Sequence, residues 1–278
     1  MTSFAEEAFS LFNMFSIFKE HRHNAKQIFM LARTELKKDY KGSFLGAGWA
    51  LIKPLFTLFI YWFAFGVGLR MSSKINGLPR FDFMLVGFIP WFFINDSILF
   101  GSQSIRRNRQ FVVKMHFPVS NIMTFTLLEK FFVHLMLTAL MCVYLFFNGY
   151  YPTVHTIQFF YYAPMMFLFF LALSWSTAPM SAFSRDFENF IKSIITGLFW
   201  MSGITWDSYA LDSVWLHRLM LLNPINYFVN GYRKAFIYHE WFFEYSTETI
   251  VFLLEFLLIA ILGMYNYKRF RTKLPDVL

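Results

Sequence analysis

Long apolar segments constrain the fold of this chain more than any other feature. An α-helix needs about 20 mostly apolar residues to cross the hydrocarbon layer of a bilayer. Only 15% of the residues are charged, against about 25% in a soluble domain. The sequence therefore predicts an all-α polytopic membrane protein with six transmembrane helices. The expected spans are Leu45–Leu69, Phe81–Ser104, Ser120–Phe147, Thr156–Ala182, Phe187–Trp206 and Thr249–Tyr267.

The distribution of basic residues predicts the orientation of these spans. If the crossings alternate, 17 of the 25 lysines and arginines fall in segments on one side and six on the other. Loops on the cytoplasmic side carry the excess of positive charge. We therefore expect a multi-pass protein of the plasma membrane with both termini in the cytoplasm. The inner cations are spread over four separate segments, which argues against a nucleic-acid partner despite the net charge of +8.

Three regions follow from this pattern. Residues 1–43 contain two amphipathic stretches, which predict cytoplasmic helices at the membrane interface. Residues 44–267 form the six-helix transmembrane domain. Residues 268–278 form a basic cytoplasmic tail.

Two half-length apolar stretches lie between the fifth and sixth spans. Ser213–Leu222 and Ile225–Ile237 are too short to cross a bilayer, and Asn223 and Pro224 separate them. They predict a re-entrant hairpin that enters from the outer side, within residues 207–238. A pair of helices lying flat on the outer membrane surface is the alternative.

Catalytic and metal-binding motifs are missing from the sequence. It contains no G-x-x-x-x-G-K-[ST] motif, so the chain has no P-loop of its own for ATP. Its seven histidines are scattered, and its single cysteine, Cys142, forms no pair. We therefore predict no catalytic residue, metal site or cofactor in this chain.

A basic and apolar stretch, RRNRQFVVKMHFPV, separates the second and third spans. It predicts a short cytoplasmic helix over residues 106–117. Such a helix could dock into a groove of a soluble partner, with its apolar residues in the groove and its cations at the rim. An amphipathic loop on anionic lipid is the alternative. The candidate contact residues are Arg106, Arg107, Arg109, Phe111, Lys114 and His116.

Several ionisable and aromatic residues lie inside the expected spans. A charged side chain near the bilayer centre costs about 2.5–3.5 kcal/mol, so these residues need a cavity or a partner helix. Structural pairing between helices is one explanation, and a polar pathway is the other. The tryptophans and tyrosines similarly suit either interfacial belts or stacking against sugar rings. The ionisable residues are Lys53, Asp96, Glu129, Lys130 and Glu255.

Several collinear motifs resemble those of a known family. They are LGAGWALIKPLFTLFIYWFAFGVGLR, MLVGFIPWFFINDSI, VVKMHFPVS, SRDF, LNPINYFVNGYR and KRFRTKLPDVL. They are similar to the membrane subunits of ABC-2 type polysaccharide exporters, and in particular to the wall teichoic acid permeases of Gram-positive bacteria. The resemblance covers the chain from about Ala32 to the C-terminus.

The resemblance implies a homodimer with the ABC-2, or type V, exporter fold. Two copies of a nucleotide-binding subunit would bind ATP and Mg, so this chain alone would not be an enzyme. Residues 106–116 would form the coupling helix that transmits ATP-driven movement, residues 25–40 an interface helix, and residues 207–237 the outer gate. The gate candidates are Trp200, Trp206, Asn223 and Pro224.

The resemblance also implies a cargo. The cargo would be a wall teichoic acid polymer, a polyanionic glycopolymer carried on undecaprenyl diphosphate and moved from the cytoplasmic to the outer side. O-antigens, capsular polysaccharides and small drugs are alternative cargoes, and a membrane-embedded lipid-sugar enzyme is an alternative of another class. Lys53 stands where family members often have Asn. The channel and entrance candidates are Lys37, Tyr40, Trp49, Lys53, Tyr61, Trp91, Phe92 and Asp96.

Overall fold

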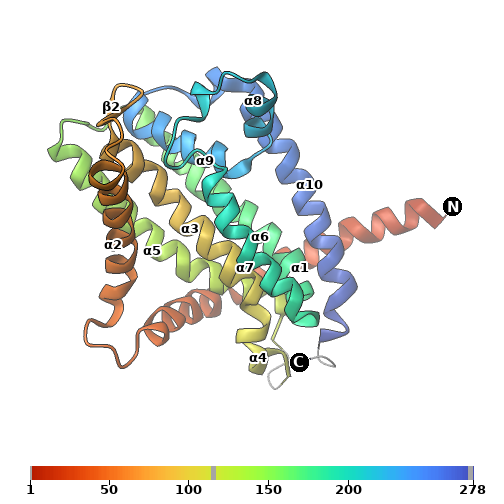
Figure 1. Ribbon diagram of the computed structural model, residues 1–278. Helices are drawn as coiled ribbons and strands as arrows, with labels where there is room; N and C mark the ends of the chain where they lie inside the picture. The colour runs from red at the N-terminus through yellow and green to blue at the C-terminus, as the bar shows by residue number, and fades with distance from the viewer. Residues whose placement is uncertain (1, 114–116, 275–277) are drawn as a thin grey trace.

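The computed structural model describes residues 2–113, 117–274 and 278, with side chains from residue 20 onward. Almost all of the described secondary structure is helical (Figure 1). One short β-hairpin departs from the all-α prediction. The helices are α1 (Thr2–Asp39), α2 (Trp49–Phe63), α3 (Arg80–Arg107), α4 (Arg109–Val113), α5 (Val119–Phe147), α6 (Phe159–Phe183), α7 (Arg185–Trp200), α8 (Val214–Leu221), α9 (Pro224–Arg233) and α10 (Ser246–Arg271), and the strands are β1 (Lys74–Ile75) and β2 (Leu78–Pro79).

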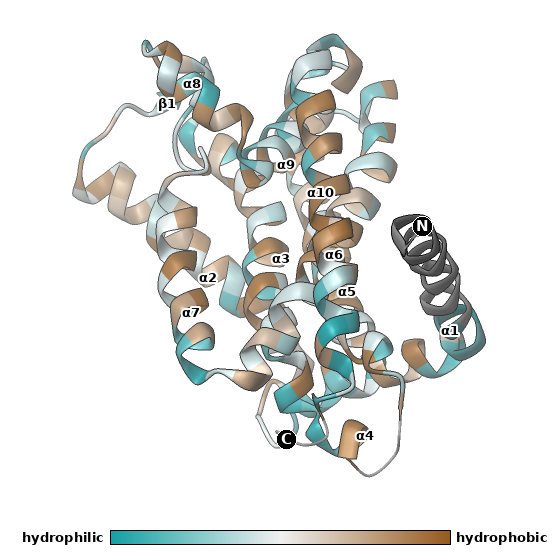
Figure 2. Ribbon diagram, turned by 90° about the vertical axis from the view of Figure 1, so that its right-hand side faces the viewer, coloured by the Kyte–Doolittle hydropathy of each residue, from teal (hydrophilic) through white to brown (hydrophobic). Residues whose placement is uncertain are grey.

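Five helical segments of the described chain are long and apolar enough to cross a membrane. They contain α2, α3, α5, α6 and α10 and correspond to five of the six spans expected from the sequence. Apolar residues run along the middle of these helices, while hydrophilic residues gather near α4 and the C-terminus (Figure 2). The ranges are Gly46–Gly68, Arg80–Arg107, Val119–Phe147, Val154–Phe183 and Phe242–Arg271.

The remaining expected span, 187–206, differs from the prediction. Its helix, α7, has 16 residues and ends at Trp200 instead of Trp206. At about 1.5 Å per residue this helix is about 24 Å long, less than a hydrocarbon layer of about 30 Å. The chain turns after Trp200, where Gly203 adopts a φ of +61° that favours glycine. The sixth crossing therefore stays a prediction.

The connections gather at two opposite ends of the bundle, as alternating spans require (Figure 1). The hairpin β1–β2 and helix α8 lie at one end, and α4 and the C-terminus lie at the other. The hairpin turns at Asn76 and Gly77, which both have positive φ.

Helix α3 forms the centre of the bundle and packs against α5, α6, α7 and α9. The long N-terminal helix α1 packs on α5. There Glu20 accepts a hydrogen bond from Ser120 Oγ at 2.9 Å, and Ile28 and Ala32 are buried. The two amphipathic stretches expected in residues 1–43 are thus parts of one continuous helix.

Close approach of α6 and α10 depends on Gly263. A Cβ atom at this position would collide with the backbone carbonyl of Ala172. Gly263→Ala should therefore lower the free energy of unfolding by about 1–3 kcal/mol, because neither backbone can move easily. Thermal unfolding in detergent measures the effect.

Gly197 provides the matched control, since a Cβ atom there meets nothing within 4 Å. Gly197→Ala should be neutral or stabilising, because alanine favours a helix over glycine by about 1 kcal/mol. Equal unfolding temperatures for the two alanine variants would contradict the close packing.

Candidate functional site

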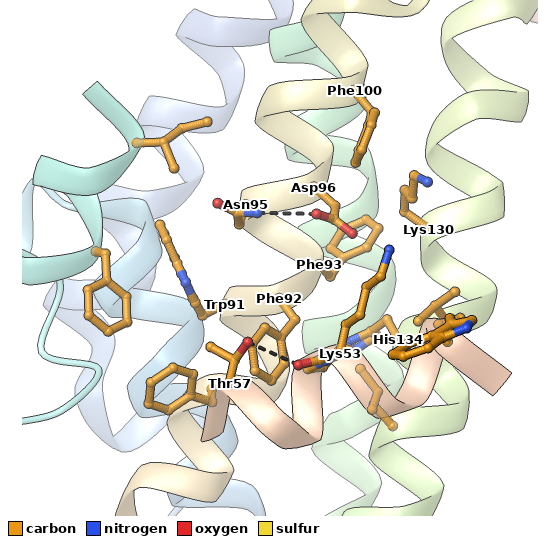
Figure 3. A pocket seen from close by; sticks show the side chains of 18 of the residues that line it. Lys53, Thr57, Trp91, Phe92, Phe93, Asn95, Asp96, Phe100, Lys130 and His134 are labelled. Atoms are coloured by element: carbon orange, nitrogen blue, oxygen red, sulfur yellow. Dashed lines mark hydrogen bonds between the residues drawn. The ribbon is translucent and has the colours of Figure 1, made fainter. Parts of the chain in front are cut away.

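A cavity of about 620 Å³ opens between α2, α3, α5 and α7 (Figure 3). Helical spacing explains which residues line it, since positions three and four apart share one face of a helix. Helix α2 contributes Trp49, Lys53, Thr57 and Tyr61 in this way. The other face of α2 is exposed and apolar, as expected for contact with lipid or another chain; it includes Leu55, Phe56, Phe59, Ile60 and Phe63.

Seven of the eight predicted channel residues surround this cavity. Lys37 is the exception: it is exposed and does not line the cavity. Trp200, predicted for the outer gate, also lines it. The seven are Tyr40, Trp49, Lys53, Tyr61, Trp91, Phe92 and Asp96.

Aromatic rings form much of the cavity wall. Tyr61 packs against Phe88 and Phe199 with ring centroids 5.2 and 5.1 Å apart, and Trp91 packs against Phe199 at 5.4 Å. These contacts hold the rings in place by mutual packing. Such a wall suits stacking against sugar rings or sliding contact with a chain molecule.

Polar side chains lie at the middle of the cavity. Asn95 Nδ2 donates to Asp96 Oδ1 at 3.1 Å (Figure 3). Lys53 extends across the cavity from α2 and lies 5.6 Å from the centre of the Tyr40 ring. Burial raises the pKa of the Tyr40 phenol, which therefore stays protonated and able to donate a hydrogen bond.

A charged network forms part of the cavity wall. Asp39, the last residue of α1, pairs with Arg107 of α3 and Lys130 of α5, each at 3.1 Å. Lys130 also pairs with its neighbour Glu129 at 2.8 Å. Both cations lie over the ring of Phe100, at 4.7 and 4.1 Å from its centre. As neighbours on a helix, Glu129 and Lys130 were expected to need separate partners, but here they pair with each other. No local pattern points to Asp39 or Phe100.

The basic stretch after α3 differs from the single helix predicted over 106–117. Helix α3 continues to Arg107, Asn108 interrupts it, and α4 has only five residues. Arg106 pairs with Glu188 of α7 at 2.7 Å, so its charge is already paired within this chain. Arg109 is exposed, while Phe111 packs against Phe117 and Phe125 at 5.6 Å each. Lys114 and His116 lie outside the described residues.

Two of the outer gate candidates start helix α9, and the other two contact each other in the turn after α7. Asn223 caps α9, because its Oδ1 accepts from the backbone of Ile225 at 3.0 Å, and Pro224 occupies the first helical position. Trp206 Nε1 donates to the Trp200 carbonyl at 3.0 Å. Helices α8 and α9 are separate and short, as predicted from the two half-length stretches.

Arg233 is the residue near this end that sequence reasoning missed. It is 1% exposed, and its guanidinium donates to the carbonyls of Phe83, Gly203 and Ile204 and to Asn230 Oδ1. Burial lowers the pKa of Arg233 to about 9, so the group stays charged at neutral pH. None of the ion pairs among the described residues involves it. Arg233 therefore joins α3, α9 and the turn after α7.

Comparison with protein families identifies the family of this chain. Residues 26–237 match the model of the ABC-2 type transporter. The chain belongs to the ABC-2 type transporter family. The match covers the cavity, α4 and the α8–α9 pair, so all three lie within the part of this ABC-2 chain that defines the family. As an ABC-2 permease subunit it implies a membrane setting and an ABC ATPase partner.

Curated relatives of this ABC-2 chain carry a more specific name. O-antigen export system permease protein RfbA of Myxococcus xanthus is 27% identical over 212 residues, 76% of this chain and 80% of that protein. Two proteins of the same name from Klebsiella pneumoniae are each 24% identical over 253 residues, 90% of this chain and 93% of theirs.

Proposed function

We propose that this chain is the permease subunit of an exporter for lipid-linked polysaccharides of the O-antigen type. The cavity supports this proposal: about 620 Å³ of space lies between aromatic walls and a polar centre. Sugars offer apolar ring faces and polar hydroxyl groups, and both have matching partners there. The polymer would enter on its polyprenyl diphosphate carrier and leave on the outer side.

The relatives favour O-antigen over wall teichoic acid as the cargo. Those reported above are all named as O-antigen export permeases. O-antigen, one of the alternative cargoes expected from the sequence, therefore replaces wall teichoic acid as the proposed cargo.

The proposed assembly is a homodimer with two ATPase subunits. The exposed apolar face of α2 supports contact with a second copy. Reconstitution of the chain with its ATPase in vesicles tests the function. ATP-dependent appearance of a lipid-linked O-antigen at the opposite leaflet is the expected result, and its absence in an active complex would contradict the proposal.

Helix α4 is the proposed contact with the ATPase. Arg109 is exposed, and it takes part in none of the ion pairs of the described residues, so its charge is available to a partner. Arg109→Glu should reduce co-purification of the ATPase by about tenfold, since reversed charge at an interface is repulsive.

Lys74→Glu is the matched control for Arg109→Glu. Lys74 is also exposed but lies in β1, at the opposite end of the bundle. This variant should bind the ATPase normally. Equal loss of the ATPase in both variants, or in neither, would remove α4 from the interface.

A further inference from the structure

One carboxylate bridges two cations in the cavity wall. Asp39 Oδ1 accepts from Arg107 Nη2 at 3.1 Å, and Asp39 Oδ2 accepts from Lys130 Nζ at 3.1 Å. The three side chains come from α1, α3 and α5, and all of them line the cavity. The side chain of Lys130 is 6% exposed and that of Arg107 is 38% exposed, so the bridge reaches from the interior toward solvent.

The two bonds of Asp39 are the longer ones in this network. Charge-assisted N–H···O bonds are usually about 2.7–2.9 Å long. The Lys130–Glu129 pair is 2.8 Å long, whereas both Asp39 pairs are 3.1 Å long. Asp39 is also the last residue of α1, where the helix carbonyls disfavour a negative charge. Residues 40–45 after it are not helical, so the helix ends at this carboxylate.

The two cations keep their places without Asp39. Lys130 retains Glu129, and Lys130 and Arg107 both retain the ring of Phe100. Lys53 adds a third positive charge from across the cavity and has no ion pair among the described residues. Asp96 also lines the cavity, with one oxygen bonded to Asn95. Three cations therefore face an incoming anion, and the carboxylates of Asp96 and Glu129 stay beside them, with Asp96 close enough to Lys53 and Lys130 to interact with both.

We propose that Asp39 is a displaceable counter-ion for the phosphates of a polyprenyl diphosphate. The phosphate oxygens replace its carboxylate between Arg107 and Lys130, and the end of α1 is released from α3 and α5. A diphosphate carries more charge than a carboxylate and reaches both cations at once, which favours the exchange. The inference rests on the proposed function, because a lipid-linked cargo supplies the diphosphate.

Binding to the full chain in lipid nanodiscs tests the exchange. The probes are geranylgeranyl diphosphate, geranylgeraniol and inorganic pyrophosphate. Asp39→Asn should bind geranylgeranyl diphosphate about tenfold more tightly than the unmodified chain, because the competing charge is gone. Arg107→Gln should bind it about tenfold more weakly, and geranylgeraniol should not respond to either change. Tighter binding of pyrophosphate by Asp39→Asn also supports the exchange and assigns recognition to the phosphates alone.

Glu35→Gln is the matched control. Glu35 lies one turn earlier on α1, pairs with Lys38 at 3.0 Å and does not line the cavity. It should leave binding of all three probes unchanged. Unchanged or weaker diphosphate binding in Asp39→Asn, or equal tightening in Glu35→Gln, would overturn the proposal.

Release of α1 has its own readout. A nitroxide at Thr34→Cys, an exposed site on α1, in a Cys142→Ser background should gain mobility when geranylgeranyl diphosphate is added. No gain at saturation would overturn the release. If the complex exports the polysaccharide but Asp39→Asn binds the diphosphate as the unmodified chain does, this inference is rejected and the proposed function is kept. Tighter binding in Asp39→Asn without any export would keep this inference and reject the proposed function.

Discussion

Arg233→Ala is expected to lower the free energy of unfolding by about 3–5 kcal/mol, the sum of lost hydrogen bonds and lost packing. The substitution leaves the carbonyls of Gly203 and Ile204 without their donor, while the Phe83 carbonyl keeps its place in the hydrogen bonding of α3. Each orphaned buried acceptor costs about 1–3 kcal/mol. The lost side chain also opens a void, because Arg233 is among the largest fully buried residues described. Thermal and denaturant unfolding of the purified chain measure the loss.

Two further variants separate the effect of the guanidinium hydrogen bonds on stability from the effect of losing a positive charge. Arg233→Lys keeps the charge but loses the forked donors, so it should recover only part of the stability. Arg218→Ala removes an exposed arginine from the neighbouring helix α8 and should leave unfolding unchanged. A stable Arg233→Ala protein would show that the carbonyl contacts contribute little to holding the turn after α7.

Filling the cavity should stop transport without unfolding the protein. Thr196 lines the cavity from α7 and is exposed, so Thr196→Trp places an indole in the open space without displacing packed atoms. We expect ATP-dependent polysaccharide export to fall at least about tenfold, the effect of raising a barrier by about 1.4 kcal/mol. Vesicle transport with the ATPase present measures it.

Ser193→Trp is the control for the added indole. Ser193 is exposed one turn earlier on α7 but does not line the cavity. Export should stay near its normal rate in this variant, and ATPase binding should be normal in both. Full export by Thr196→Trp would mean that the polymer does not pass through this cavity.

Local sequence patterns predicted most of the helices, because apolar length and helix capping depend on residues close together in the chain. Five of the expected spans are helices of sufficient length, since apolar length alone meets the thickness of a bilayer. Asn223 and Pro224 separate α8 and α9 as expected, because a cap followed by proline starts a helix. The pattern was wrong at the end of α7 and at the start of the basic stretch. At both places distant partners intervene: Arg233 holds the turn after Trp200, and Glu188 holds Arg106.

By itself the sequence determined that lipid is the solvent of this chain, where five of its long apolar helices lie and where basic residues cluster. These properties depend on composition and on neighbours a few positions apart. Only the tertiary structure decided that α2, α3, α5 and α7 enclose a cavity, that Asp39 meets Arg107 and Lys130, and that Arg233 lies within reach of Phe83. Those contacts join residues 68 to 150 positions apart. They depend on which helix faces meet, and no local pattern encodes that choice.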